Sequence, residues 1–202
     1  MINDKGATEM QRYAFIFILA GFTLLFSGCG TKQSSETFLR EDIDLDLVTR
    51  VAVLPFENYT KEQYIDERVR DVSITQVLAL GIADVVDKGI VDSVMREEVI
   101  EPGKPIDLVN LKRLGQRLNV QAFLLGSVDE ANEIRKGSLT FPELALTMRL
   151  VDASGSIVLW QASGRRSGET LMGRIFGIAP KDQFYVTLKL TKKLLSSIPS
   201  KR

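Results

Sequence analysis

The chain has 202 residues, of which 45% are hydrophobic, and this suits one folded domain with a short extension. Basic and acidic residues number 26 each, so the net charge is zero and lacks the basic excess that nucleic-acid binding usually requires. The chain has no histidine and a single cysteine, Cys29. This count excludes a Cys/His zinc site, an intrachain disulfide and a Cys–His nucleophile pair.

An uncharged apolar stretch, Ala14–Phe26, lies near the N-terminus and follows Arg12. It suits the apolar region of a signal peptide, but it is shorter than the about 20 residues of a transmembrane helix. The following Ser-Gly-Cys resembles the bacterial lipobox, in which a small residue precedes a cysteine that is lipidated before cleavage; Phe26 departs from the aliphatic residue usual there. We therefore predict a signal peptide over residues 1–28 and lipidation of Cys29, against the alternative of an incidental cysteine.

Cleavage before Cys29 removes two basic and two acidic residues, so the mature chain stays neutral. Its membrane attachment then depends on acyl chains such as palmitate, which contribute about 0.8 kcal/mol per buried CH₂. Gly30 follows the cysteine, and by resemblance to Gram-negative lipoproteins this favours the periplasmic side of the outer membrane. Residues 1–9 carry Asp4, Lys5 and Glu9 and so lack the positive charge usual before a signal sequence; translation from Met10 would give a more ordinary signal peptide.

A polar stretch, Gly30–Glu36, suits a flexible tether. In Phe38–Leu47, acidic residues alternate with apolar ones, which suits either a calcium site or an edge strand or solvated arm. No glycine-containing twelve-residue calcium loop follows, and this favours the strand or arm. We assign residues 29–47 to a tether and arm, and residues 48–202 to a single domain.

The apolar patterns and turn residues of that domain predict a series of strands and helices. In chain order these are strand Arg50–Phe56, helix Ile65–Ile82, strand Ala83–Val86, a helix from Asp87 to about Glu98, a helix begun by Asp107, strand Gln121–Val128, a hairpin of Leu144–Val151 with Ser156–Gln161, and helix Gln183–Ile198.

Three side-chain patterns refine this prediction. Ile90, Val91 and Val94 are expected to face inward, and the leucines at 108, 111, 114 and 118 form one helical stripe. Trp160 is expected in the core. The order β-α-β-α-α-β-β-β-α predicts the α/β class, as a mixed-sheet α/β sandwich of two or three layers.

Several segments resemble the CsgG/LpoB-type bacterial outer-membrane lipoproteins. They are Val51–Thr60, Ala83–Glu98, Leu114–Glu130 and Leu146–Gly164, and the likeness covers about residues 48–198. The Gly115–Gly126 pattern departs from the family at Gln121. The resemblance implies a fold like that of the TolB N-terminal domain, and a role as a pore, an activator of peptidoglycan synthases or another envelope lipoprotein.

A pore-forming member would need additional amphipathic strands of about nine to eleven residues. We expect no two such hairpins between Val128 and Leu144, or between Gln161 and Gln183. This disfavours a channel.

No motif for catalysis stands out. Gly164–Gly168 lacks the Gly-Lys-Ser/Thr ending of a phosphate-binding loop, and no Gly-x-Ser-x-Gly elbow is present. Ser-Lys or Asp-Asp catalysis is not excluded by counting, but no spacing singles out a pair. We therefore expect no enzyme, no cofactor and no metal site.

Two segments are candidates for binding a partner. Asn58 and Tyr59 follow the first predicted strand, where an exposed tyrosine suits a protein interface; the alternative is a turn with a half-buried ring. The loop 165–180 carries Leu171, Met172, Ile175 and Phe176, which suit an oligomer, partner or membrane contact, or else a loop that folds back over the sheet.

We therefore expect a lipid-anchored, non-catalytic protein that binds an envelope partner and supports cell-wall synthesis or secretion. The alternatives are a homo-oligomeric subunit of a secretion ring or channel of the curli-secretion type, and an unrecognised hydrolase.

Overall fold

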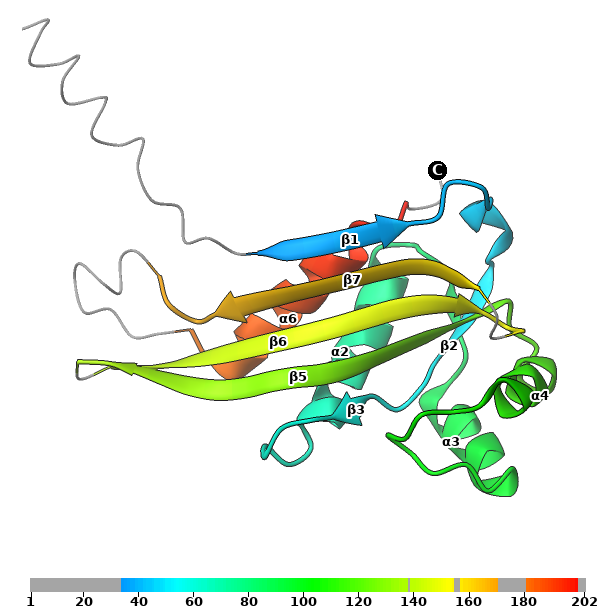
Figure 1. Cartoon of the computed structure of the whole chain (residues 1–202), viewed down its shortest axis with the longest axis horizontal. Helices are drawn as coiled ribbons and strands as arrows, with labels where there is room; N and C mark the ends of the chain where they lie inside the picture. The colour runs from blue at the N-terminus through cyan, green and yellow to red at the C-terminus, as the bar shows by residue number, and fades with distance from the viewer. Residues whose placement is uncertain (1–33, 138, 155–156, 171–180, 200–202) are drawn as a thin grey trace, which may run out of the picture. The chain divides into compact units, whose positions relative to one another are not determined.

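The computed structural model of the chain describes residues 34–137, 139–154, 157–170 and 181–199 (Figure 1). In chain order its elements are β1 (Ser35–Leu39), the 3-10 turn η1 (Leu45–Leu47), β2 (Arg50–Val53), β3 (Glu57–Asn58), α2 (Ile65–Ala79), β4 (Asp84–Val85), α3 (Lys88–Glu97), α4 (Leu108–Leu118), β5 (Ala122–Lys136), β6 (Leu139–Asp152), β7 (Val158–Ser167) and α6 (Gln183–Leu195). The predicted order is confirmed, with β1 and β3 as additional short strands.

The strands form one mixed sheet in the order β1-β7-β6-β5-β2-β4, and β3 pairs with β5 beyond the end of β2. The long strands β5, β6 and β7 and the edge strand β1 are antiparallel neighbours. The short strands β2, β3 and β4 are parallel to their neighbours. The predicted mixed-sheet α/β sandwich is therefore confirmed.

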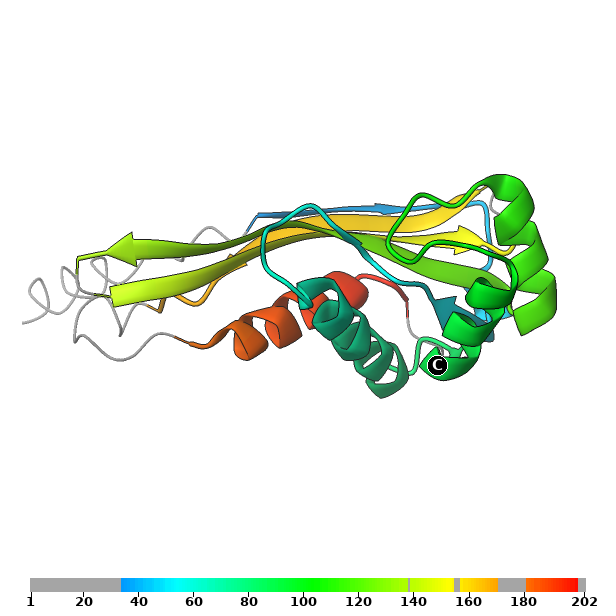
Figure 2. The same ribbon diagram turned by 90° about the horizontal axis from the view of Figure 1, so that it is seen from below.

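Helices cover the two faces of the sheet unequally. Helices α2 and α6 contribute to a large apolar cluster with the strands β2, β5, β6 and β7, and Figure 2 shows both helices below the sheet. On the other face, α3 and α4 form a second cluster, which reaches the sheet at Ala52, Leu54 and Phe123. The sandwich thus has three layers around β2 and the start of β5. It has two layers over most of β6 and β7.

The two aspartates at which we predicted helices to begin, Asp87 and Asp107, are both N-caps. The Asp87 carboxylate accepts hydrogen bonds from the backbone N–H groups of Gly89 and Ile90, and the Asp107 carboxylate accepts one from Asn110. These bonds satisfy N–H groups that the first turn of a helix leaves unpaired.

Two predicted inward positions were wrong. Ile90 is 53% exposed, and Met95 on the same helix is buried instead. Leu108 is 58% exposed, whereas the other three leucines of its stripe are buried. Both exposed residues lie in the first turn of their helix, and the first buried side chains are Val91 on α3 and Leu111 on α4. Trp160 is fully buried as predicted, and its indole N–H donates to Ser197 Oγ at 2.9 Å.

Residues 129–136 and 139–143, to which we assigned no element, belong to a long hairpin. β5 continues to Lys136, and β6 begins at Leu139, with continuous pairing between them. A β-bulge between Val128 and Glu130 shifts the register once. Beyond it, residues 130–136 are mostly polar, with Ala131 and Ile134 as the apolar residues, so no apolar period-two pattern marks the strand.

The edge strand β1 lies within the predicted tether and arm. Ser35 to Leu39 pair with Gly164 to Trp160 of β7, so chain pairing with the sheet begins well before residue 48. The edge-strand interpretation of Phe38–Leu47 therefore holds only at Phe38 and Leu39, and the predicted flexible tether is wrong at Ser35 and Glu36, which are paired with β7. The acidic residues beyond Leu39 surround η1. There Asp44 caps the turn by accepting from the Asp46 N–H.

Gly126 permits a close approach between β5 and Phe56. A Cβ atom at this position would lie 2.6 Å from Phe56 Cε2, and the phenyl ring is itself fully buried. We expect Gly126→Ala to lower the free energy of unfolding by about 1–3 kcal/mol through overpacking, measured by urea denaturation. Combining it with Phe56→Leu should cost less than the sum of the two single changes, because the smaller side chain makes room. Strict additivity would contradict this.

Candidate functional site

Asn58 and Tyr59, the predicted partner-binding pair, differ in their roles. Asn58 organises its own loop: its amide donates to Glu62 O and Asp66 Oδ1, and its oxygen accepts from the N–H and hydroxyl of Thr60. The Tyr59 side chain is 67% exposed, so the half-buried ring that we considered is not observed. Its role in binding a partner stays a prediction.

The Tyr59 hydroxyl donates a hydrogen bond to the Glu57 carboxylate. This bond and the negative charge of Glu57 raise the pKa of Tyr59 above its ordinary value of 10.0. Asp129 raises it further, while Arg149 opposes these effects. Tyr59 is therefore a neutral hydrogen-bonding phenol near charges of both signs.

These groups meet on the face of the sheet that α2 and α6 do not cover. A shallow hollow of about 180 Å³ lies there, lined by Glu57, Tyr59, Gly126, Ser127, Thr147, Arg149 and Gln161. We call this surface, over β5, β6 and β7, the open face. The side chains of the open face point away from the core because alternate residues of a strand point to opposite sides of the sheet. On β6, for example, Met148 and Leu150 are buried in the core, while Arg149 between them is exposed.

A hydrogen-bond network crosses the open face beside the hollow. Asp129, at the β-bulge, accepts from Ser127 Oγ at 2.6 Å and from Thr147 Oγ1 at 2.7 Å. The Thr147 hydroxyl also lies 2.9 Å from Ser163 Oγ on β7. Farther along, Arg165 forms an ion pair with Glu130. The open face is therefore polar and its side chains are held in place by one another.

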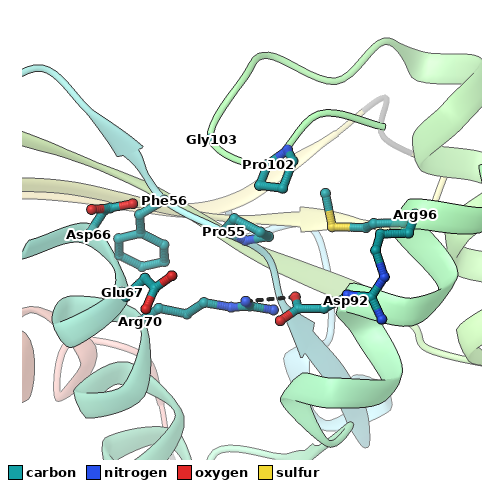
Figure 3. A pocket seen from close by; sticks show the side chains of 10 residues that line it. Pro55, Phe56, Asp66, Glu67, Arg70, Asp92, Arg96, Pro102 and Gly103 are labelled. Carbon is teal, nitrogen blue, oxygen red and sulfur yellow. Dashed lines mark ion pairs between the residues drawn. The ribbon is translucent and has the colours of Figure 1, made fainter. Parts of the chain in front are cut away.

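A second hollow, which we call the Arg70 cleft, lies beyond the carboxyl end of β2, between α2 and α3 (Figure 3). Its volume is about 210 Å³, and it is lined by Pro55, Phe56, Asp66, Glu67, Arg70, Asp92, Met95, Arg96, Pro102 and Gly103. The carboxyl ends of parallel strands are common ligand sites in α/β proteins.

Arg70 is the buried charged group of this cleft, with its side chain only 4% exposed. Its Nε donates to Val53 O at the end of β2 at 3.0 Å, and its Nη1 lies 2.7 Å from Asp92 Oδ1 on α3. Figure 3 shows the guanidinium pointing from α2 towards Asp92. The ion pair thus joins two helices that pack on opposite faces of the sheet.

Sequence analysis missed the Arg70 cleft and the position of Arg149 beside the hollow of the open face. In the sequence, Arg70 follows the inward-facing Val69 directly, so it looked like an ordinary polar position of an amphipathic helix. No local signal in the sequence marks Arg70 as buried, because the groups that pair with it, Asp92 and Val53 O, belong to other elements. Arg149 sits at an outward position of a regularly alternating strand, where a solvated charge is the usual outcome.

The remaining predicted sites, Cys29 and the residues 171, 172, 175 and 176, lie outside the described residues. Within the part of the chain that the structure describes, no cluster of three or more potential ligands could hold a metal ion. Among the same residues, none of the helices has the length and apolar character needed to span a membrane.

The sequence matches no protein-family model. It also matches no curated protein. Solved structures do match. The chain is similar to the PelC dodecamer from Paraburkholderia phytofirmans, with a TM-score of 0.61 and 21% identity over 84% of this chain and 99% of that chain. It is also similar to the lipoprotein GNA1162 from Neisseria meningitidis, with a TM-score of 0.53 and 16% identity over 74% of this chain and 94% of that chain.

These identities establish a shared fold and no more. A fainter likeness is to the LpoB C-terminal domain from Salmonella enterica, with a TM-score of 0.43 and 13% identity over 60% of this chain and 83% of that chain. The likeness to GNA1162 shows that the chain has a fold found in a bacterial lipoprotein, as predicted. Membership of the CsgG/LpoB type stays a prediction.

The hydrogen bond between Tyr59 and Glu57 can be tested by titration. We expect Glu57→Gln to lower the pKa of Tyr59, because a neutral amide no longer disfavours the phenolate next to it. The measurement is the pH dependence of the Tyr59 ¹³Cζ chemical shift. Glu133→Gln, an exposed change on the distant hairpin, should leave that titration unaltered. An unchanged Tyr59 titration in Glu57→Gln would contradict the assignment.

Proposed function

We propose that this protein is a lipid-anchored, non-catalytic component of the bacterial cell envelope that binds another envelope protein through the open face. The proposed site of attachment is Cys29, and the proposed location is the periplasmic side of the outer membrane. Support comes from the lipobox-like sequence and from the fold shared with the lipoprotein GNA1162.

The observation that carries the proposal is a sheet surface that its own helices leave uncovered. Tyr59 and Arg149 lie on it around one hollow. Tyrosine and arginine are among the residue types that contribute most to the binding energy of protein interfaces. A partner covering the hollow would remove water from around these side chains, which strengthens their hydrogen bonds and ion pairs.

The same surface offers little for catalysis. Its polar groups, Asp129, Thr147 and Ser163, are bonded to one another, and no histidine exists in the chain to act as a general base. We therefore favour protein binding, in support of cell-wall synthesis or secretion, over an enzymatic role. No cofactor enters this proposal.

A second candidate function is suggested by the PelC likeness. PelC forms a dodecamer, and its structure matches 84% of the length of the present chain. On this hypothesis the partner on the open face is a second copy of the chain, and the copies form a ring. We do not extend this candidate to a channel of the curli-secretion type.

Lipidation can be tested directly in a Gram-negative host. We expect the native protein to incorporate an alkyne-labelled palmitate and to lose residues 1–28. Cys29→Ser should incorporate no label and keep those residues, as seen by intact mass spectrometry. Labelling of Cys29→Ser, or an unmodified Cys29 in the native protein, would rule out the anchor.

Binding through the open face can be tested by photo-crosslinking in living cells. With p-benzoylphenylalanine replacing Tyr59 or Gln161, we expect the same adduct from both positions. Placed at Lys112, an exposed position on α4, the crosslinker should not form that adduct. Arg149→Glu should reduce the adduct at least about fivefold, as expected when a charge is reversed in an interface.

The mass of the adduct separates the two candidates. An adduct with another envelope protein supports the first proposal, and an adduct of two copies of this chain supports the ring. If positions 59, 161 and 112 give indistinguishable adducts, or none, then the open face is not a binding surface.

A further inference from the structure

Helix α6 has two sides of opposite character. Its buried residues come in pairs, at 186–187, 190–191 and 194–195, and they pack on β6, β7 and α2. The pairs between them, at 184–185, 188–189 and 192–193, lie on the other side of the helix, where each residue is exposed or half-buried. Figure 2 shows this helix beneath the sheet, on the side away from the open face. We call the exposed side the outer side of α6.

Phe184 and Tyr185 form the aromatic part of the outer side. Phe184 is 57% exposed. The ammonium groups of Lys181 and Lys189 lie 5.4 Å and 5.6 Å from the centre of the Tyr185 ring, so cation–π attraction holds both lysines beside the aromatic pair. Exposed aromatic rings next to lysines are typical of helices that lie on a membrane surface, where the ring enters the lipid and the ammonium groups stay in water.

The outer side of α6 is also basic. Residues 181–199 contain four lysines and a single acidic residue, Asp182, which gives this stretch a net charge of +3 in a chain that is neutral overall. The Asp182 carboxylate is engaged at the start of the helix, where it accepts from the Tyr185 N–H at 2.7 Å. A local excess of positive charge attracts a negatively charged surface.

The proposed lipid anchor can bring this surface to a membrane. Five residues, 30–34, separate Cys29 from Ser35 at the start of β1, so the chain between these two residues extends at most about 20 Å. Ser35 in turn lies close to α6, because a Cβ atom at Gly164 would be 3.3 Å from Ser35 Cβ and 3.1 Å from Leu194 Cδ2. A helix with its side chains is about 10–12 Å across, so its outer side is within reach of the lipid that holds Cys29.

We propose that the outer side of α6 rests on an anionic phospholipid surface, as a second membrane contact beside the anchor. Phe184 enters the headgroup region, and the lysines at 181, 189, 192 and 193 face lipid phosphates. The proposal rests on the lipidation of Cys29, since the anchor holds α6 next to lipid and makes even a weak contact effective. For this reason we favour lipid over an acidic protein.

This contact would orient the domain. Helix α6 and the open face lie on opposite sides of the sheet. With α6 on the membrane, the open face points away from it, where a protein partner can reach Tyr59 and Arg149.

The test uses the full lipidated protein in vesicles of brominated phosphatidylcholine with about 30% phosphatidylglycerol as the anionic lipid. Bromine quenches tryptophan fluorescence on contact, and the native Trp160 is fully buried in the core. We expect the fluorescence of Phe184→Trp to fall at least about twofold relative to vesicles without bromine, because rings on such helices lie about 5–10 Å deep. Tyr59→Trp, a matched aromatic change on the open face, should show no such loss.

Two further changes test the role of charge. In neutral vesicles of phosphatidylcholine alone, quenching of Phe184→Trp should fall at least about twofold, because lysines are attracted only to an anionic surface. Adding Lys189→Glu and Lys192→Glu to Phe184→Trp should have the same effect in the anionic vesicles. Lys104→Glu with Lys112→Glu, a matched pair of exposed lysines away from α6, should leave the quenching unchanged.

Flotation of the vesicles separates this proposal from the proposed function. If the protein floats with the vesicles but Phe184→Trp is quenched no more than Tyr59→Trp, the anchor stands and the contact through α6 is wrong, which leaves the outer side to an acidic protein. Equal quenching in neutral and anionic vesicles would also overturn the proposal. A protein that does not float defeats the anchor itself, and this proposal with it.

Discussion

The structure depends on the burial of strand β5 between two apolar layers. At Ala122–Leu124 this strand pairs with β2 on one edge and β6 on the other. Leu124 contacts the cluster under α2 and α6, while Phe123 contacts the cluster under α3 and α4. A strand in this position cannot shift by one residue without exchanging its two apolar faces, so it fixes the register of the whole sheet.

The same strand also produces the uneven covering of the sheet. β5 extends from the three-layer region through the bulge into a hairpin with β6, while α3 and α4 reach the sheet only around β2, β4 and the start of β5. The strands therefore continue beyond one helix layer, and this leaves the open face. Polar residues suit that face because they can be bonded to one another across the strands, as Asp129, Thr147 and Ser163 are.

The two hollows follow from the ends and edges of this arrangement. The hollow beside Tyr59 exists because β3 runs along β5 only briefly before its loop leaves the sheet. The Arg70 cleft exists because β2 ends at Val53, and beyond this residue no strand lies between helices α2 and α3. There Arg70 replaces a strand partner, with Nε donating to the last carbonyl of β2.

Local chemistry was sufficient to predict much of the fold. The capping aspartates at 87 and 107, the buried Trp160 and the order of the main elements follow from side-chain type and spacing, which act within a few residues along the chain. The lipobox-like segment around Cys29 is also a local pattern. Tertiary structure alone decided the pairing of residues 129–143, the exposure of Ile90, and the meeting of Arg70 with Asp92. These depend on contacts between segments distant in sequence, where strand pairing or a neighbouring helix overrides the local pattern.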